Sequence, residues 1–210
     1  MSKQPNRSRR PHPFIIKDKF FHKAKEAGFR ARSVFKLDEL DKEFKIIKEG
    51  MNICDIGAAP GSFLQYIYQK VKQTGIIVWI DLKRINPIWA SNVHLIQSDI
   101  FDFENLIPQI KTILGEIKLF DTITSDIAPN TTGRRDVDQY ASVELNIEIL
   151  KFADVFLKKW GNLLLKVFKG EDFHDLVKEV EKRYERFTEY KPIACRDRSM
   201  EEYVICFKKK

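Results

Sequence analysis

The sequence predicts an α/β fold with a mainly parallel sheet covered by helices on both faces. Short segments of nearly continuous apolar content alternate along the chain with segments of helical periodicity, which is typical of buried parallel strands joined by crossover helices. The 210 residues, 43% of them hydrophobic, can bury one sizeable core, and no repeat or Pro/Gly/Ser-rich linker divides them. We therefore expect a single folded domain.

The elements are expected to alternate regularly after an opening helix. That helix, over residues 33–47, places four apolar residues on one face, namely Val34, Leu37, Leu40 and Phe44. Strands are expected at 51–56, 75–81, 92–99, 120–126, 162–168 and 202–208, and further helices at 62–73, 103–114, 137–160 and 173–185. In such a sheet, ligands bind beyond the carboxyl ends of the strands.

Positive charge is concentrated at the amino terminus. Residues 1–32 hold ten Lys or Arg against two acidic residues, a net charge of +8, and since the whole chain carries +7 the rest sums to −1. A strongly cationic amino-terminal segment on an otherwise nearly neutral chain favours a polyanionic partner such as nucleic acid. The stretch 1–16 alone is typical of a disordered, solvated tail, so the domain is expected to span 17–210.

Nothing in the sequence indicates a membrane or secreted protein. The longest apolar runs are a few residues, and the amino terminus lacks the apolar segment of a signal peptide. The three cysteines, Cys54, Cys195 and Cys206, form no Cys-x-x-Cys pair and predict neither a disulfide nor a zinc site. We expect a cytoplasmic monomer without a metal.

The segment 53–63, ICDIGAAPGSF, predicts a small-molecule site. Gly57 and Gly61 bracket a turn from a strand into a helix, where the backbone can approach a ligand closely. Asp81 ends the second strand, where its carboxylate can accept hydrogen bonds from the two hydroxyls of a ribose. The turn and the acid together indicate a nucleoside-containing ligand.

The turn favours a ligand without a diphosphate. A dinucleotide fingerprint would need glycine at Ala59, and the carboxylate of Asp55 would repel a phosphate and attract a cationic or amino-bearing group. A nicotinamide-dependent oxidoreductase is therefore disfavoured. S-adenosylmethionine, with its sulfonium and amino groups, fits this turn better.

Three other polar residues lie near the expected strand ends. Asp99 follows the third strand, where it could bond the exocyclic amine of an adenine or cap a turn. Asp126 ends the fourth strand beside the same site. Lys166 interrupts the apolar strand LLLKVF, and because an unpaired amine is costly to bury, we expect it to be paired or functional.

Five segments, read together, resemble the FtsJ/RrmJ family of ribose 2′-O-methyltransferases. They are KAKEAGFRARSVFKLDEL (23–40), DIGAAPGSF (55–63), SDIAPN (125–130), LLKVFKGE (164–171) and RDRSMEEYVICF (196–207). The resemblance implies a Rossmann-like, S-adenosylmethionine-dependent methyltransferase domain with a seven-stranded sheet. It also implies methylation of a ribose in RNA, with a uridine of large-subunit ribosomal RNA as the first expectation.

The resemblance assigns residues to both parts of the reaction. The catalytic quartet of the family falls on Lys36, Asp126, Lys166 and Glu201, where the pattern Ser-x-Glu-x-Tyr selects Glu201 over its neighbour Glu202. The cofactor contacts fall on Gly61, Phe63, Asp81, Asp99 and Asp126. The chain departs from the bacterial pattern at Phe63, which stands where that pattern has tryptophan and so lacks the indole donor.

Two roles are open for Lys166. A ribose hydroxyl holds its proton tightly, whereas a sulfonium methyl is already activated and needs an in-line approach. Burial and the nearby cation at Lys36 favour the neutral amine, which could accept the proton as a general base. If Asp126 and Glu201 keep the amine protonated, it would instead stabilise the developing alkoxide.

RNA is the expected partner, held mostly through its phosphates by Lys17, Lys19, Lys23, Arg30, Arg32, Arg134 and Arg135. Transfer RNA anticodon loops and messenger caps are alternative substrates within the broad family. A non-catalytic RNA-binding assembly factor would explain the charge but has no use for a buried Lys166. An amino-group methyltransferase needs Asp/Asn-Pro-Pro-aromatic at 126–130 and a cytosine C5 enzyme typically a cysteine after proline, and the chain has neither.

Overall fold

A computed structural model of the chain describes residues 19–57, 59–84, 86–115, 118–196 and 199–210. The tail expected at 1–16 and the cation expected at Lys17 lie outside the described residues. The boundary between tail and domain therefore stays a prediction.

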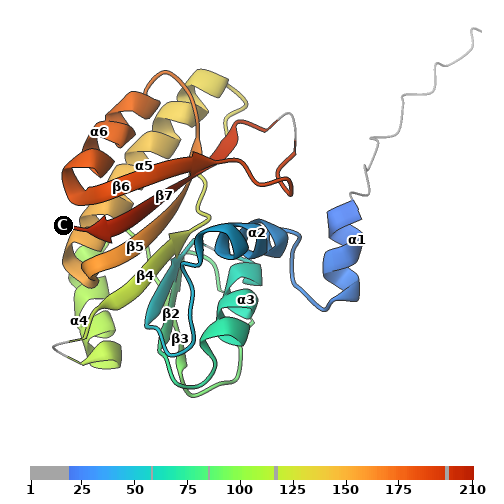
Figure 1. Cartoon of the computed structure of the whole chain (residues 1–210), viewed down its shortest axis with the longest axis vertical. Helices are drawn as coiled ribbons and strands as arrows, with labels where there is room; N and C mark the ends of the chain where they lie inside the picture. Colours follow the sequence, from blue (N-terminus) through green and yellow to red (C-terminus); the bar gives the residue numbers. More distant parts are fainter. Residues whose placement is uncertain (1–18, 58, 85, 116–117, 197–198) are drawn as a thin grey trace, which may run out of the picture.

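Within the described residues, one seven-stranded sheet is accompanied by six helices (Figure 1). The strands are β1 (Ile53–Ile56), β2 (Ile77–Asp81), β3 (Val93–Gln97), β4 (Phe120–Ser125), β5 (Leu157–Phe168), β6 (Tyr184–Tyr190) and β7 (Glu201–Lys209). The helices are α1 (Lys19–Glu26), α2 (Val34–Phe44), α3 (Ser62–Val71), α4 (Phe103–Leu114), α5 (Arg135–Phe156) and α6 (Phe173–Arg183).

The sheet has the order β3-β2-β1-β4-β5-β7-β6. Strands β1 to β5 pair in parallel, whereas β7 runs antiparallel to both β5 and β6. The predicted α/β fold with a mainly parallel sheet is therefore confirmed. The strand order changes direction between β1 and β4, which is the position where ligands bind in sheets of this type.

The two faces of the sheet carry separate apolar clusters. Helices α4, α5 and α6 cover one face and α2 and α3 cover the other (Figure 1). Along β5, Leu163 and Leu165 pack into the first cluster and Leu164 into the second. Because side chains alternate along a strand, Lys166 shares a side with Leu164, the side covered by α2.

The structure differs from the predicted elements at three places. Helix α1 was not expected, since the sequence analysis assigned no element before residue 33. The helix expected over 137–160 ends at Phe156, because Leu157 pairs with Phe120 of β4 and begins a strand that is irregular near Trp160, whose φ is 68°. Strand β6 was not expected as an element. It lies at the edge of the sheet and is mostly half-buried, and its sequence YERFTEY lacks the apolar content used to predict the other strands.

A buried carboxylate fixes helix α2 against α3. The Asp41 side chain accepts hydrogen bonds from the Ile47 main-chain N–H at 2.8 Å and from the Tyr66 hydroxyl at 2.9 Å. The ammonium of Lys70 lies 3.5 Å from the same carboxylate. These contacts tie the chain after α2 and a residue of α3 to one side chain, and so set the position of α2 on the sheet.

We expect Asp41→Ala to lower the free energy of unfolding by about 2–3 kcal/mol, because it leaves two buried donors without an acceptor. Chemical denaturation measures this change. The matched control is Lys42→Ala on the same helix, which removes the partly exposed pair of Lys42 with Asp38 and should cost less than about 0.5 kcal/mol. Equal losses for both variants would contradict the anchoring role of Asp41.

Candidate active site

Three strand ends bring polar side chains to one edge of the sheet. Asp126 directly follows β4, and Lys166 lies near the end of the parallel strand β5. Strand β7 runs in the opposite direction, so its first residue, Glu201, pairs with Phe168 at the same edge. The antiparallel last strand is therefore the reason that Glu201 joins the other two.

Helix α2 supplies the fourth member of the predicted quartet. Its buried residues Leu37 and Leu40 pack on the sheet face that Lys166 also occupies. Lys36, only 8% exposed, forms an ion pair with the Glu201 carboxylate. The structure thus brings all four predicted catalytic residues together.

The hydroxyl of Tyr203 joins the two halves of the quartet. Lys166 Nζ lies 3.1 Å from Asp126 Oδ1 and also donates to the Asp126 main-chain carbonyl. The Tyr203 hydroxyl lies 2.7 Å from Asp126 Oδ1 and 3.2 Å from Glu201 Oε1. A continuous set of contacts therefore runs from Lys36 to Lys166. Sequence reasoning gave Tyr203 no role, although its place two residues after Glu201 on one strand puts both on the same face.

The charges of this group fix the protonation of two members. Burial alone would lower the pKa of Lys36, but the carboxylates of Asp126 and Glu201 outweigh it and raise that pKa above its ordinary value. Complete burial, followed by the charges of the same two carboxylates, raises the pKa of Tyr203 well above its usual range. Lys36 is thus a persistent cation and Tyr203 a persistent donor.

A cavity of about 730 Å³ extends from this group across the ends of β4, β1 and β2. This volume is within the usual range for small-molecule sites, roughly 300–1,000 Å³. Asp126 and Lys166 line one part of it, and Asp81 and Asp99 line another. Its apolar wall includes residues that the sequence analysis did not assign to the site, namely Leu82, Phe101 and Tyr140.

Both predicted nucleoside-binding acids are held in place by the backbone. The Asp81 carboxylate accepts the N–H of Ala59 at 2.9 Å and that of Lys83 at 2.7 Å. Asp99 Oδ1 accepts the N–H of Phe101 at 3.1 Å. A carboxylate oxygen has two lone pairs, so both side chains keep acceptor capacity toward the cavity.

The glycine turn closes the cavity at β1. Gly57 has φ of 69°, and a Cβ added there would lie 2.5 Å from Ile127, so glycine is required. Gly61, with φ of 99°, immediately precedes α3. Neither Gly61 nor Phe63 lines the cavity, and the Phe63 ring is buried in the core between α2, α3 and the sheet. Their cofactor contacts stay predictions.

Asp55 does not have the role that the sequence suggested. Its side chain is completely buried and does not line the cavity. One carboxyl oxygen accepts the Thr124 hydroxyl at 2.7 Å, and the other has no partner among the described residues. Burial raises the pKa of Asp55 to about 8, so the group is mostly uncharged near neutral pH and cannot attract a cationic ligand as an anion would.

The raised pKa of Asp55 predicts a specific pH dependence of stability. The folded protein releases this proton at about pH 8 and the unfolded chain near 3.8, so the folded state loses stability as pH rises between these values. Asp55→Asn, which resembles the protonated carboxyl, should escape that loss. Its stability relative to the wild type should therefore increase across this window and level off above it. Urea denaturation at a series of pH values tests this, and a constant difference would contradict it.

The predicted RNA-binding cations differ in the contacts that their charged groups make within the protein. Arg30 donates to the main-chain carbonyls of Pro60 at 3.3 Å and Pro87 at 3.4 Å, and Arg32 donates to that of Ala194. Arg134 pairs with Asp136 at 2.9 Å, and Arg135 begins α5. Lys19 and Lys23 lie on α1, with their ammonium groups over the rings of Phe20 and Phe35.

Two further findings concern the described part of the chain. No group of three or more His, Cys, Asp or Glu side chains there is arranged to hold a metal ion. None of the described helices is both long and apolar enough to cross a membrane.

Several known proteins are similar to this chain. Curated relatives from Nitratidesulfovibrio vulgaris and Methanobrevibacter smithii are both named ribosomal RNA large subunit methyltransferase E. The first is 39% identical over 194 residues, covering 90% of this chain and 92% of the relative. The second is 36% identical over 188 residues, covering 90% and 88%.

Solved structures share the fold. A Plasmodium falciparum protein described as a ribosomal RNA methyltransferase has a TM-score of 0.76 at 28% identity, covering 86% of this chain and 98% of its own. Fibrillarin from Aeropyrum pernix, solved with bound S-adenosyl-L-methionine, has a TM-score of 0.56 at 16% identity, covering 83% and 76%. The fibrillarin likeness concerns the fold alone.

A family model described as FtsJ-like methyltransferase matches residues 29–209, which is most of the chain. This match and the identity to the curated relatives confirm the resemblance seen in the five sequence segments. The chain belongs to the FtsJ-like methyltransferase family.

Proposed function

We propose that the protein transfers a methyl group from S-adenosylmethionine to the 2′ hydroxyl of a ribose in large-subunit ribosomal RNA. The observation that carries the proposal is the buried amine of Lys166, held by Asp126 in the wall of a cavity that also presents Asp81 and Asp99. The names of the curated relatives support the ribosomal substrate.

The cavity suits a nucleoside with a cationic substituent. Asp81 offers a fixed carboxylate to ribose hydroxyls, and Asp99 offers one to an adenine amine. Ile80, Ile100 and Phe101 line the cavity between them and suit the faces of a purine ring. When bound, S-adenosylmethionine supplies a methyl group that its sulfonium has already activated for transfer.

The quartet is suited to manage the proton of an incoming hydroxyl. Lys166 is the amine that lines the cavity beside Asp126, whereas Lys36 is held behind it by Glu201. Asp126 also receives the Tyr203 hydroxyl, so its charge is shared between two donors. Lys166 can therefore either accept the hydroxyl proton or, when protonated, stabilise the oxygen anion as that proton leaves.

The RNA would approach over the side of the sheet that α2 covers. Helix α1 packs on α2, which carries Lys36. The ammonium groups of Lys19 and Lys23 stand over aromatic rings at 5.3 and 4.9 Å, in positions that keep them available to phosphates. The cationic helix thus lies on the same side of the molecule as the quartet.

Lys166→Ala should reduce methyl transfer by at least about 100-fold, because it removes the group that handles the hydroxyl proton. The assay offers labelled S-adenosylmethionine with large ribosomal subunits, free ribosomal RNA or transfer RNA, and maps the modified position. The matched control is Lys169→Ala. Lys169 lies just beyond β5, pairs with Glu189 and Glu202 on the exposed side, and should be dispensable.

Each outcome of that assay is informative. Label on a 2′ oxygen of large-subunit RNA supports the proposal, and label on a base contradicts ribose methylation. Label on transfer RNA alone would show that transfer RNA, and not ribosomal RNA, is the substrate. Full activity of Lys166→Ala would contradict its role, and retained activity of Lys166→Arg, which cannot lose its proton, would favour anion stabilisation over base catalysis.

We expect Asp81→Asn to weaken cofactor binding by about 10–100-fold, the effect of losing hydrogen bonds to a charged acceptor. Calorimetric titration with S-adenosylhomocysteine measures the affinity without turnover. Asp102→Asn is the matched control, since Asp102 caps α4 outside the cavity. An unchanged affinity for Asp81→Asn would place the nucleoside elsewhere.

A further inference from the structure

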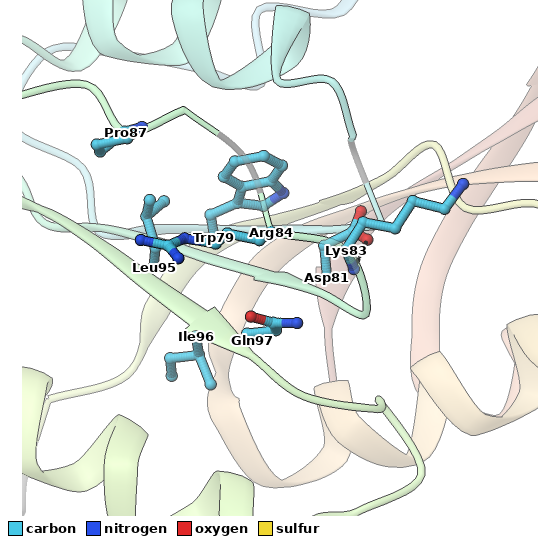
Figure 2. Close-up of a pocket in the computed structure, with 8 residues that line it drawn as sticks. All are labelled: Trp79, Asp81, Lys83, Arg84, Pro87, Leu95, Ile96 and Gln97. Atoms are coloured by element: carbon cyan, nitrogen blue, oxygen red, sulfur yellow. Dashed lines mark hydrogen bonds between the residues drawn. The ribbon is translucent and has the colours of Figure 1, made fainter.

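A second, smaller pocket lies at the β2–β3 edge of the sheet and is separate from the quartet. Its volume is about 240 Å³, and Figure 2 shows the residues that line it, which come from β2, β3 and the loop between them. Asp81 and Lys83 line both this pocket and the cofactor cavity. The two spaces therefore lie side by side, on either side of Asp81.

The pocket contains a buried donor with no acceptor. The Trp79 side chain is 1% exposed, and its Nε1–H has no hydrogen-bond partner among the described residues. Buried N–H groups are nearly always satisfied, so such a donor calls for an explanation. A carbonyl oxygen or ring nitrogen of a bound ligand would satisfy it.

The pocket also carries cations without acidic partners. Lys83 and Arg84 are exposed, and neither forms an ion pair with a carboxylate among the described residues. In Figure 2 the two side chains extend in opposite directions from the end of β2, Arg84 across the pocket and Lys83 past Asp81. Leu95 adds an apolar surface that is 38% exposed.

We propose that this pocket is a subsite for a second nucleotide of the RNA substrate, outside the nucleotide that is methylated. A nucleotide offers a phosphate to Arg84, an acceptor on the base edge to Trp79 and an apolar base face to Leu95. Single-stranded RNA is commonly bound through this combination of stacking, base-edge hydrogen bonds and cationic contacts. The inference rests on the proposed function for the choice of RNA over a free nucleotide.

The location favours a nucleotide that belongs to a longer strand. Arg30 links the loop of this pocket to the segment after α1, since it donates to the carbonyls of Pro87 and Pro60. Trp79 also packs in the apolar cluster beneath α2 and α3, the side of the sheet on which α1 lies. A strand held by the lysines of α1 can therefore continue to this pocket without crossing the sheet.

Two variants test the subsite by RNA affinity, measured with S-adenosylhomocysteine bound. Arg84→Ala should weaken RNA binding about 10-fold and reduce the slope of log K against log salt by about one, as expected for one lost phosphate contact. Leu95→Trp should fill the pocket and weaken binding by a similar factor. Both variants should keep the wild-type affinity for S-adenosylhomocysteine.

Matched controls come from the segment just before β4, at the amino ends of the parallel strands. Lys118→Ala removes an exposed cation there, and Leu119→Trp enlarges a leucine that is 39% exposed, nearly the same as Leu95. Both should bind RNA as the wild type does. Equal RNA affinity for all four variants overturns the subsite while leaving methylation by the wild type intact. If Arg84→Ala and Leu95→Trp bind RNA more weakly than the controls do, but the wild type methylates no RNA, the proposed function is overturned instead.

Fluorescence distinguishes RNA from a free nucleotide. Trp79, Trp89 and Trp160 are the three tryptophans of the chain, so Trp89→Phe with Trp160→Phe leaves Trp79 as the reporter. A short single-stranded RNA should quench Trp79 emission at least about 100-fold more tightly than uridine or adenosine monophosphate, because a longer strand adds further phosphate contacts. Equal or tighter quenching by a mononucleotide, or no quenching by either, overturns the proposal.

Discussion

The buried amine of Lys166 is the constraint on which the carboxyl edge of the sheet depends. Lys166 is only 8% exposed, and burying a charged amine without a partner costs several kcal/mol. Asp126 supplies the match twice, through its carboxylate and through its main-chain carbonyl. The loop after β4 is therefore held to β5 by the same contacts that place a carboxylate and an amine in one cavity wall.

The reversal of β7 gives that edge its second ion pair. A parallel seventh strand would bring its last residues to the edge, whereas the antiparallel strand brings its first. Neighbouring acids then divide between the two faces, since Glu201 pairs with Lys36 and Glu202 lies 3.4 Å from Lys169. Helix α2 must be placed accurately for the first of these pairs, which is the function of the buried Asp41.

Features set by residues close together in the chain were predicted well from the sequence, and features set by distant residues were not. The bounds of α4 matched the expected 103–114, because its Asp102 cap and apolar spacing are local. The helix predicted over 137–160 was too long, because Leu157 pairs with the distant Phe120 and the helix ends at Phe156. Lys166 was conspicuous in its own strand, but the contact of Lys36 with Glu201 joins residues 165 positions apart and came from family resemblance alone. The charge of Asp55 was misjudged because burial decides it.

The proposed ligands have opposite charge, and the site separates them. The cavity wall carries the carboxylates of Asp81, Asp99, Asp126 and Glu144, which suit a sulfonium. The lysines of α1 suit phosphates on the neighbouring surface. Between them stands a quartet of two amines and two carboxylates, whose formal charges cancel. With both amines protonated, such a group carries no net charge, so it neither strongly repels nor strongly attracts either proposed ligand.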